Sequence, residues 1–253
     1  MTENFNPFLT EYHTPFGTTP FHLIKTEHFE PAMEEGMKAH NRDVDAIVNN
    51  SDEPTFANTI VALEKSGALL DRVTTVFGNL LSAETSDELE VLAERMMPRL
   101  SEHSNNISLN EKLFARIKQV YDETKQGALS QEDYMLLQNT YNSFIRNGAN
   151  LTLEQKERFR QLSAELSVLT LKFSQNNLKE TNRYELILTS EQTDGLPASA
   201  LDAYAQAAKE KEKEGYLVTL HAPSFVPFMK YSTNRALRQQ LYMAYNTQCT
   251  HDD

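Results

Sequence analysis

Apolar side chains recur at steps of three and four residues through most of the chain, from about residue 26 to residue 182. That spacing gathers them on one face of a helix, so each repeat predicts an amphipathic helix with a buried side. The apolar positions of the successive faces are Phe29, Met33, Met37, Val44, Ile47 and Val48; Phe56, Ile60, Leu63, Leu70, Val73, Phe77 and Leu80; Leu89, Leu92 and Met96; Leu113, Ile117 and Val120; and Leu137, Tyr141, Phe144 and Ile145. The longest repeat follows, with the spacing of a coiled-coil seam: Phe159, Leu162, Leu166, Leu169 and Phe173.

Four of these helices are expected to start at a Ser or Thr that is followed three positions later by an acidic residue or Gln, the pattern of a capping box. The pairs are Thr85 with Glu88, Ser108 with Glu111, Ser130 with Asp133, and Thr152 with Gln155. Gly67 occupies a gap in one apolar stripe, which predicts a bend or a close approach between helices at that point.

The period changes after residue 182. Tyr184, Leu186 and Leu188 alternate in "RYELILT", which predicts a strand, and "GYLVTL" at 215–220 predicts a second one. An Ala-rich segment between them begins near Pro197 and ends at Gly215, as a helix would. The chain is therefore predicted to be mainly α, a helical array with a small strand–helix–strand insertion near residues 184–220. The expected division is 1–25, 26–182 and 183–253.

Residues 1–25 are expected to form an extended arm. Pro7, Pro15 and Pro20 each precede a Phe, and proline opposes regular structure while phenylalanine favours burial. The arm would then be held to the protein by its aromatic rings. An exposed docking motif for another protein is the alternative.

The last helix, in "NRALRQQLYMAYNTQCTHDD", carries a stripe of Leu237, Leu241 and Tyr245. No glycine cap, closing proline or polar tail follows it. We therefore expect that the natural chain continues beyond Asp253, that this stripe faced the continuation, and that the 253-residue chain self-associates through it.

Composition narrows the class of protein. The 253 residues include 24 basic and 36 acidic side chains, a formal net charge of −12, which disfavours nucleic-acid binding. A single cysteine, Cys249, excludes an internal disulfide and fits a reducing compartment. The polar start lacks the features of a signal peptide, and no apolar run is long enough to span a membrane. A cytoplasmic protein without a membrane partner is expected.

No catalytic or metal-binding residues are predicted. A local zinc site needs two His one turn apart with a Glu between them, and none of the seven histidines fits: His13, His22, His28, His40, His103, His221 and His251. A site assembled from distant His stays open. Cys249 lies two residues from His251 but is interpreted as an ordinary helix cysteine. The C-terminal tyrosines are interpreted as packing residues rather than oxyanion donors: Tyr216, Tyr231, Tyr242 and Tyr245.

Several collinear blocks resemble the N-terminal region of the thimet-oligopeptidase family of zinc metallopeptidases. They are the opening "NPF…TPF…PF" with "EHFEPAMEEGM", then "PTFANTIVALEKSGALLDRV", "GANLTLEQKERFRQLSAELSVLTLKFSQN" and the stretch from "ELILTSEQTDGLPASALDAYAQ" to "RQQLYMAY". The resemblance covers essentially the whole chain. Its opening favours the peptidyl-dipeptidase, or dipeptidyl carboxypeptidase, branch over the oligopeptidase branch.

The resemblance implies a role for each part. Residues 26–182 would be a helical lid domain that forms the wall of a substrate channel, and 183–253 would lead toward an absent catalytic domain of the same polypeptide. The parent enzyme would use zinc to hydrolyse short peptides, releasing C-terminal dipeptides. This chain has no HExxH motif, should bind no zinc and should be inactive alone. The alternative is a stand-alone helical module that binds peptides or proteins.

Overall fold

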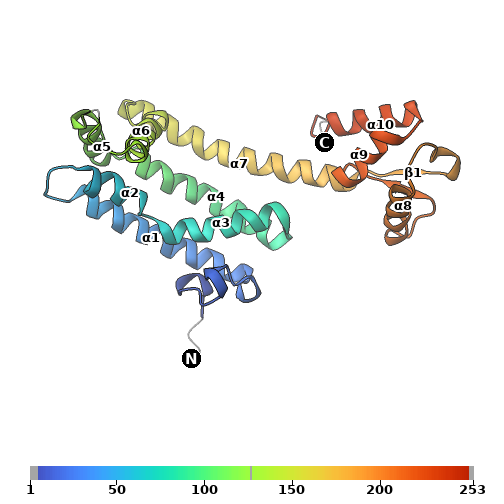
Figure 1. The fold of residues 1–253 in the computed structure, drawn as a ribbon, viewed down its shortest axis with the longest axis horizontal. Helices are drawn as coiled ribbons and strands as arrows, with labels where there is room; N and C mark the ends of the chain where they lie inside the picture. The colour runs from blue at the N-terminus through green and yellow to red at the C-terminus, as the bar shows by residue number, and fades with distance from the viewer. Residues whose placement is uncertain (1–4, 126, 251–253) are drawn as a thin grey trace. The chain divides into compact units, whose positions relative to one another are not determined.

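The computed structural model describes residues 5–125 and 127–250 (Figure 1). These residues are mainly helical and include a two-stranded antiparallel sheet, which confirms the predicted fold class. They form two compact units that divide inside one helix, between Val168 and Leu169. The predicted boundaries after residues 25 and 182 stay predictions. Within the described ranges, no helix has both the length and the apolar character that crossing a membrane requires.

The first unit begins with short 3-10 turns and continues as a helical array (Figure 1). The turns are η1 (Pro7–Leu9), η2 (Pro15–Gly17), η3 (Phe21–Leu23) and η4 (Thr26–His28). They are followed by α1 (Phe29–Val48), the π-helical η5 (Phe56–Val61), α2 (Ala62–Glu64), α3 (Ala68–Ala83), α4 (Asp87–Ser108), α5 (Glu111–Glu123), α6 (Gln131–Arg146) and the start of α7 (Leu153–Arg183).

Helix α1 packs against α3 and α4, and its first turns bury a row of aromatic rings. Phe29 lies between Phe8 and Phe77, with ring centroids 5.0 Å and 5.2 Å away. A side chain at Gly36 would place a Cβ 2.9 Å from Leu70 Cα. The two helices therefore approach as closely as a glycine allows. The far end of α1 joins a second core with η5, α5 and α6, built from Val44, Ile47, Ile60, Leu113, Ile117, Val120, Leu137 and Phe144.

Of the three phenylalanines of the arm that follow a proline, Phe8 is the one that is buried. Phe8 is fully buried, Asn6 Nδ2 donates to the His28 carbonyl at 2.8 Å, and Arg72 donates to the Phe8 carbonyl. The other two rings, Phe16 and Phe21, are exposed. The prediction that the aromatics hold the arm is thus right for Phe8 and wrong for the other two. Phe16 lies in η2 and Phe21 begins η3, and both rings face solvent.

Two of the four predicted helix starts are confirmed. The Ser130 side chain caps α6, and Thr152 with Gln155 forms a reciprocal cap at the start of α7. The predicted caps Thr85 and Ser108 are wrong, because Ser86 caps α4 and Asn110 caps α5. In both cases another good capping residue stands one or two positions further along.

The second unit is a small α+β fold around one apolar cluster. Strand β1 (Leu186–Leu188) pairs antiparallel with β2 (Tyr216–Val218), with Leu186 opposite Val218. The helices are α8 (Ala198–Glu210), α9 (Ala222–Tyr231) and α10 (Arg235–Asn246), with η6 (Ser190–Gln192) after β1. Tyr204 on α8 is buried in the cluster, and its hydroxyl donates to the Ser224 carbonyl at 2.7 Å. Burial raises the pKa of Tyr204 to about 12.

Helix α10 does not leave the expected stripe free. Leu241 is fully buried, and Leu237 and Ala244 pack against the core of the second unit. Tyr245 stacks on Phe225 of α9, with ring centroids 4.3 Å apart. The prediction that this stripe is an exposed interface is therefore wrong. The sequence pattern correctly shows an apolar face, but Leu237 and Leu241 pack in the core of the second unit, and Tyr245 is the member of the stripe that stays 44% exposed.

Gly67 confirms the predicted bend and close approach. It lies between α2 and α3 with a left-handed φ of 70°, and a Cβ there would be 2.7 Å from His40 Nδ1. Both the backbone conformation and the contact exclude a side chain.

We expect Gly67→Ala to lower the free energy of unfolding by about 1–3 kcal/mol, because alanine is strained in this conformation and collides with the His40 ring. The matched control is Gly78→Ala in the middle of α3, where an added Cβ meets nothing within 4 Å. That variant should gain about 0.5–1 kcal/mol from helix propensity. Urea denaturation of both variants measures the difference, and equal effects would contradict it.

Candidate functional site

A cavity lies between the start of α1 and the first half of α4. Its volume is about 770 Å³. Carboxylates line much of it: Glu27, Glu30, Glu34, Asp87 and Glu88. Arg95 contributes a guanidinium group to the lining, and Pro31, Val91 and Leu92 contribute an apolar surface. The cavity lining therefore combines carboxylates with apolar side chains.

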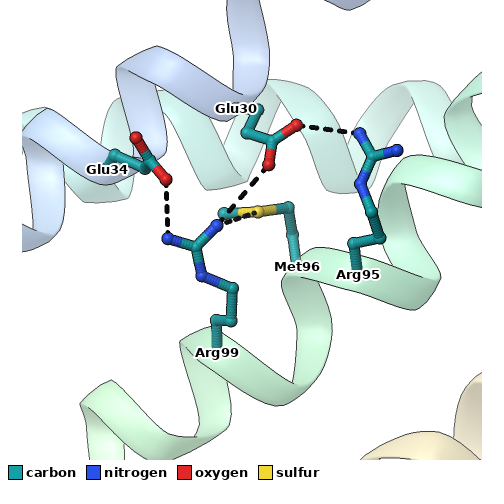
Figure 2. A network of polar contacts seen from close by, with 5 residues as sticks. All are labelled: Glu30, Glu34, Arg95, Met96 and Arg99. Atoms are coloured by element: carbon teal, nitrogen blue, oxygen red, sulfur yellow. Dashed lines mark hydrogen bonds and ion pairs between the residues drawn. The ribbon is translucent and has the colours of Figure 1, made fainter.

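Two arginines of α4 hold two glutamates of α1 along one side of this cavity, as Figure 2 shows. Arg95 Nη2 lies 2.8 Å from Glu30 Oε2, and Arg99 Nη1 lies 3.5 Å from Glu30 Oε1. Arg99 Nη2 donates to Glu34 Oε1 at 2.7 Å. Each pair of like residues is four positions apart, so one turn of α1 faces one turn of α4. The network sets how the two helices meet.

The network also sets the electrostatics of the cavity. The hydrogen bond from Arg99 lowers the pKa of Glu34 below its ordinary value, so this carboxylate is ionised at neutral pH. Asp87 lies in the first turn of α4, where free backbone N–H groups favour negative charge. A carboxylate held ionised as Glu34 is suits binding of a cationic group better than proton transfer.

One histidine pair is brought together from distant parts of the chain. His103 Nε2 on α4 lies 3.1 Å from His40 Nδ1 on α1, so one of the two nitrogens donates a hydrogen bond to the other. Burial lowers the pKa of both imidazoles, and Asp43 partly opposes this at His40. Over the described ranges, no group of three or more His, Cys, Asp or Glu side chains could hold a metal ion. The pair is thus a neutral hydrogen-bonded contact between helices.

The remaining histidines lie apart from this pair. His13 and His22 are exposed on the arm. His28 Nδ1 accepts from the Lys25 backbone at 3.1 Å, and His221 Nε2 lies 3.0 Å from Asn182 Oδ1. His251 lies outside the described residues.

Cys249 lies beside a carboxylate, which disfavours the reactive thiolate. Its backbone N–H donates to Glu180, and burial together with Glu180 raises the pKa of the thiol. A catalytic cysteine needs the opposite environment. A second cavity of about 380 Å³ lies nearby in the same unit, where Glu180, Arg183 and Tyr184 form part of its wall.

Two of the four C-terminal tyrosines pack against other residues of the second unit. Tyr216 packs against the core of the second unit, and Tyr245 stacks on Phe225. Tyr231 and Tyr242 are about half exposed.

Comparison with known proteins gives one consistent result. No protein-family model matches the chain. Dipeptidyl carboxypeptidase of Escherichia coli is 34% identical over 250 residues, which cover 98% of this chain and 37% of that protein. Oligopeptidase A of the same organism is 32% identical over 97% of the chain and 36% of its own length. Organellar oligopeptidase A of Arabidopsis thaliana is 28% identical over 98% of the chain.

These matches identify the class of protein. The chain is homologous, over nearly all its length, to one region of a group of peptidases. That group contains dipeptidyl carboxypeptidase and oligopeptidase A, and the chain belongs to this family, the M3 peptidases. The resemblance inferred from the sequence blocks is confirmed. The chain spans about a third of the length of the relatives it matches.

The network of Glu30, Glu34, Arg95 and Arg99 was missed in the sequence. Each helix does carry like charges four residues apart, which is a usable pattern. The pattern identifies a charged face but does not show which other helix meets it.

We expect Arg99→Met to raise the pKa of Glu34 toward its ordinary value, since the guanidinium hydrogen bond is the main cause of the shift. NMR titration of the glutamate side-chain carboxyl carbons measures it. Stability should change by less than about 1 kcal/mol, because the partners are partly exposed. Arg42→Met, which removes the pair with Glu35 on α1, is the control. An unchanged Glu34 titration in Arg99→Met would contradict the assignment.

The His40–His103 pair predicts acid sensitivity. Both pKa values are lower in the folded protein than the ordinary 6.5, so the unfolded chain binds more protons just below that pH. This contribution to stability is present above pH 6.5 and is lost as the pH falls through the lowered values. In His103→Gln, the free energy of unfolding should fall less between pH 7 and pH 5 than in the wild-type protein. Parallel curves would refute the prediction.

Proposed function

We propose that this chain is the non-catalytic, channel-wall portion of a zinc-dependent peptidase that hydrolyses short peptides. The observation that carries the proposal is the match to dipeptidyl carboxypeptidase, which takes in 98% of this chain but 37% of the relative. The sequence itself contains no His-Glu-x-x-His motif, the pattern by which such an enzyme holds its metal. Zinc and the catalytic groups would come from the remaining part of the peptidase.

The proposed role of this portion is to control access. The helical lid would admit short, unfolded peptides to a metal centre where zinc polarises the scissile carbonyl and a glutamate moves the proton. Release of C-terminal dipeptides is the favoured specificity, in line with the name of the Escherichia coli relative, dipeptidyl carboxypeptidase. The proposal includes a cytoplasmic location for the protein.

A second candidate is a stand-alone module that binds peptides without cleaving them. The acid-lined cavity between α1 and α4 favours it, because a lining of five carboxylates, a guanidinium and apolar side chains suits a peptide with basic and apolar side chains. Such binding should weaken as salt is added.

The test is reconstitution. We expect the 253-residue chain alone to show no peptidase activity. Co-expressed with the part of Escherichia coli dipeptidyl carboxypeptidase that lies outside the matched region, it should restore zinc-dependent cleavage. Mass spectrometry of a blocked hexapeptide distinguishes dipeptide release from internal cleavage, and a chelator should abolish both.

The outcomes separate the two candidates. Activity in the mixture but in neither part alone supports the channel-wall role. No activity in the mixture, together with micromolar binding of a Lys-rich peptide to the chain alone in calorimetry, supports the binding module instead. A Glu-rich peptide of equal length is the matched ligand control.

A further inference from the structure

The turn at residues 14–18 of the arm presents one phenylalanine in an unusual backbone conformation. Phe16 has φ 60° and ψ 16°, in the left-handed region, and it is fully exposed. A residue with a bulky side chain is strained there, and glycine or asparagine is the usual occupant. An exposed phenyl ring also forgoes the stabilisation that burial would give. Two unfavourable features at one residue indicate a role outside the folding of the turn.

The turn is closed by its own hydrogen bonds. The Gly17 N–H donates to the Thr14 carbonyl at 3.0 Å, and the Thr18 N–H donates to the Pro15 carbonyl at 3.3 Å. Both threonine hydroxyls add a bond across the same turn: Thr14 donates to the Thr18 carbonyl, and Thr18 donates to the Pro15 carbonyl at 3.1 Å. The ring is therefore presented from a closed turn rather than from a loose loop.

The chain on both sides of the turn is fixed to the first unit. Before the turn, Phe8 is buried, and the Arg72 guanidinium lies 4.8 Å from the centre of the Tyr12 ring. After the turn, Pro20 is buried. These residues and Phe16 all belong to the first unit. A fixed base lowers the conformational entropy that Phe16 would lose on binding, which favours binding through its ring.

The arm that carries the turn is apolar and nearly uncharged. Among residues 5–25, Glu11 and Lys25 are the only Asp, Glu, Lys or Arg side chains, whereas the whole chain has a net charge of −12. Phe21 and Leu23 of the same arm are 55% and 45% exposed. Few charges together with aromatic rings are typical of the core of a protein–protein interface. The partner is therefore expected to offer an apolar pocket rather than a charged groove.

A second copy of this chain is a poor partner for the ring. The cavity between α1 and α4 is lined by five carboxylates, and the cavity in the second unit is lined partly by Glu180, Arg183 and Glu185. A phenyl ring placed in either cavity would take charged groups out of water. The relatives indicate a better partner, because they match nearly the whole chain while about two thirds of each relative lies outside the match.

We propose that Phe16 is a docking residue, and that its ring inserts into an apolar pocket on the peptidase-bearing remainder of an M3 polypeptide. This inference rests on the proposed function, because it assumes that such a remainder is the partner.

The experiment uses the full 253-residue chain with an affinity tag, co-expressed with the part of Escherichia coli dipeptidyl carboxypeptidase outside the matched region. The test variant is Phe16→Asn, because asparagine tolerates the left-handed conformation and the ring is removed. The matched control is Leu153→Asn at the start of α7, which replaces another apolar residue of the first unit that is 78% exposed. Urea denaturation of each chain alone checks folding, and Phe16→Asn should be at least as stable as the wild-type chain.

We expect capture of the partner by the wild-type chain and by Leu153→Asn, and at least a tenfold loss of capture by Phe16→Asn. Equal capture by all three would overturn the inference while leaving the proposed function intact. An equal loss in both variants would also overturn it, because the effect would not be specific to the turn. No capture by the wild-type chain, with no restored activity, would overturn both.

A photo-crosslinking analogue of phenylalanine, p-benzoylphenylalanine, placed at position 16 locates the contact directly. Mass spectrometry should find its crosslinks on peptides of the Escherichia coli part. Crosslinks to a second copy of this chain alone would assign the ring to self-association and overturn the proposal.

Discussion

The contact between Gly36 of α1 and Leu70 of α3 sets the spacing on which the first part of the molecule depends. With no side chain at position 36, the two helices approach until an added Cβ would lie 2.9 Å from Leu70 Cα. That approach brings Phe77 onto Phe29 and places Gly67 against the His40 ring. It also leaves Glu30 and Glu34 on a different face of α1, where they meet the arginines of α4. One glycine thus serves the aromatic core, the histidine pair and the ionic network together.

The sequence predicts the type of each element well and its surroundings less well. Helical spacing is a local property, so the long helices and the two strands could be inferred from residue patterns alone. The same patterns cannot say what covers an apolar face. Leu237 and Leu241 were expected to be free and are covered. Two of the four predicted helix caps were wrong for a related reason. Ser86 and Asn110 cap α4 and α5 in place of near neighbours of similar capping ability.

The candidate site could be anticipated only in its parts. Acidic residues on α1 and α4 are visible in the sequence, but the cavity between them exists because these two helices meet. His40 and His103 are 63 positions apart, and no short motif joins them. The resulting protonation states are the ordinary ones at neutral pH. Glu34 is held ionised, the histidines are held neutral, and the Cys249 thiol is held protonated. Such side chains are suited to hold and orient rather than to transfer protons, which agrees with the proposed channel-wall role.

The arm has a further consequence through Phe8. Its ring is fully buried against Phe29, its carbonyl accepts from Arg72, and Asn6 ties the same turn to the His28 carbonyl. The arm therefore fills part of the core with the Phe8 side chain. Phe16 and Phe21, further along the arm, are exposed to solvent. A shortened chain that began at α1 would have a hole in its core the size of a phenylalanine side chain, and the α1 and α3 helices would have to close around it or admit water.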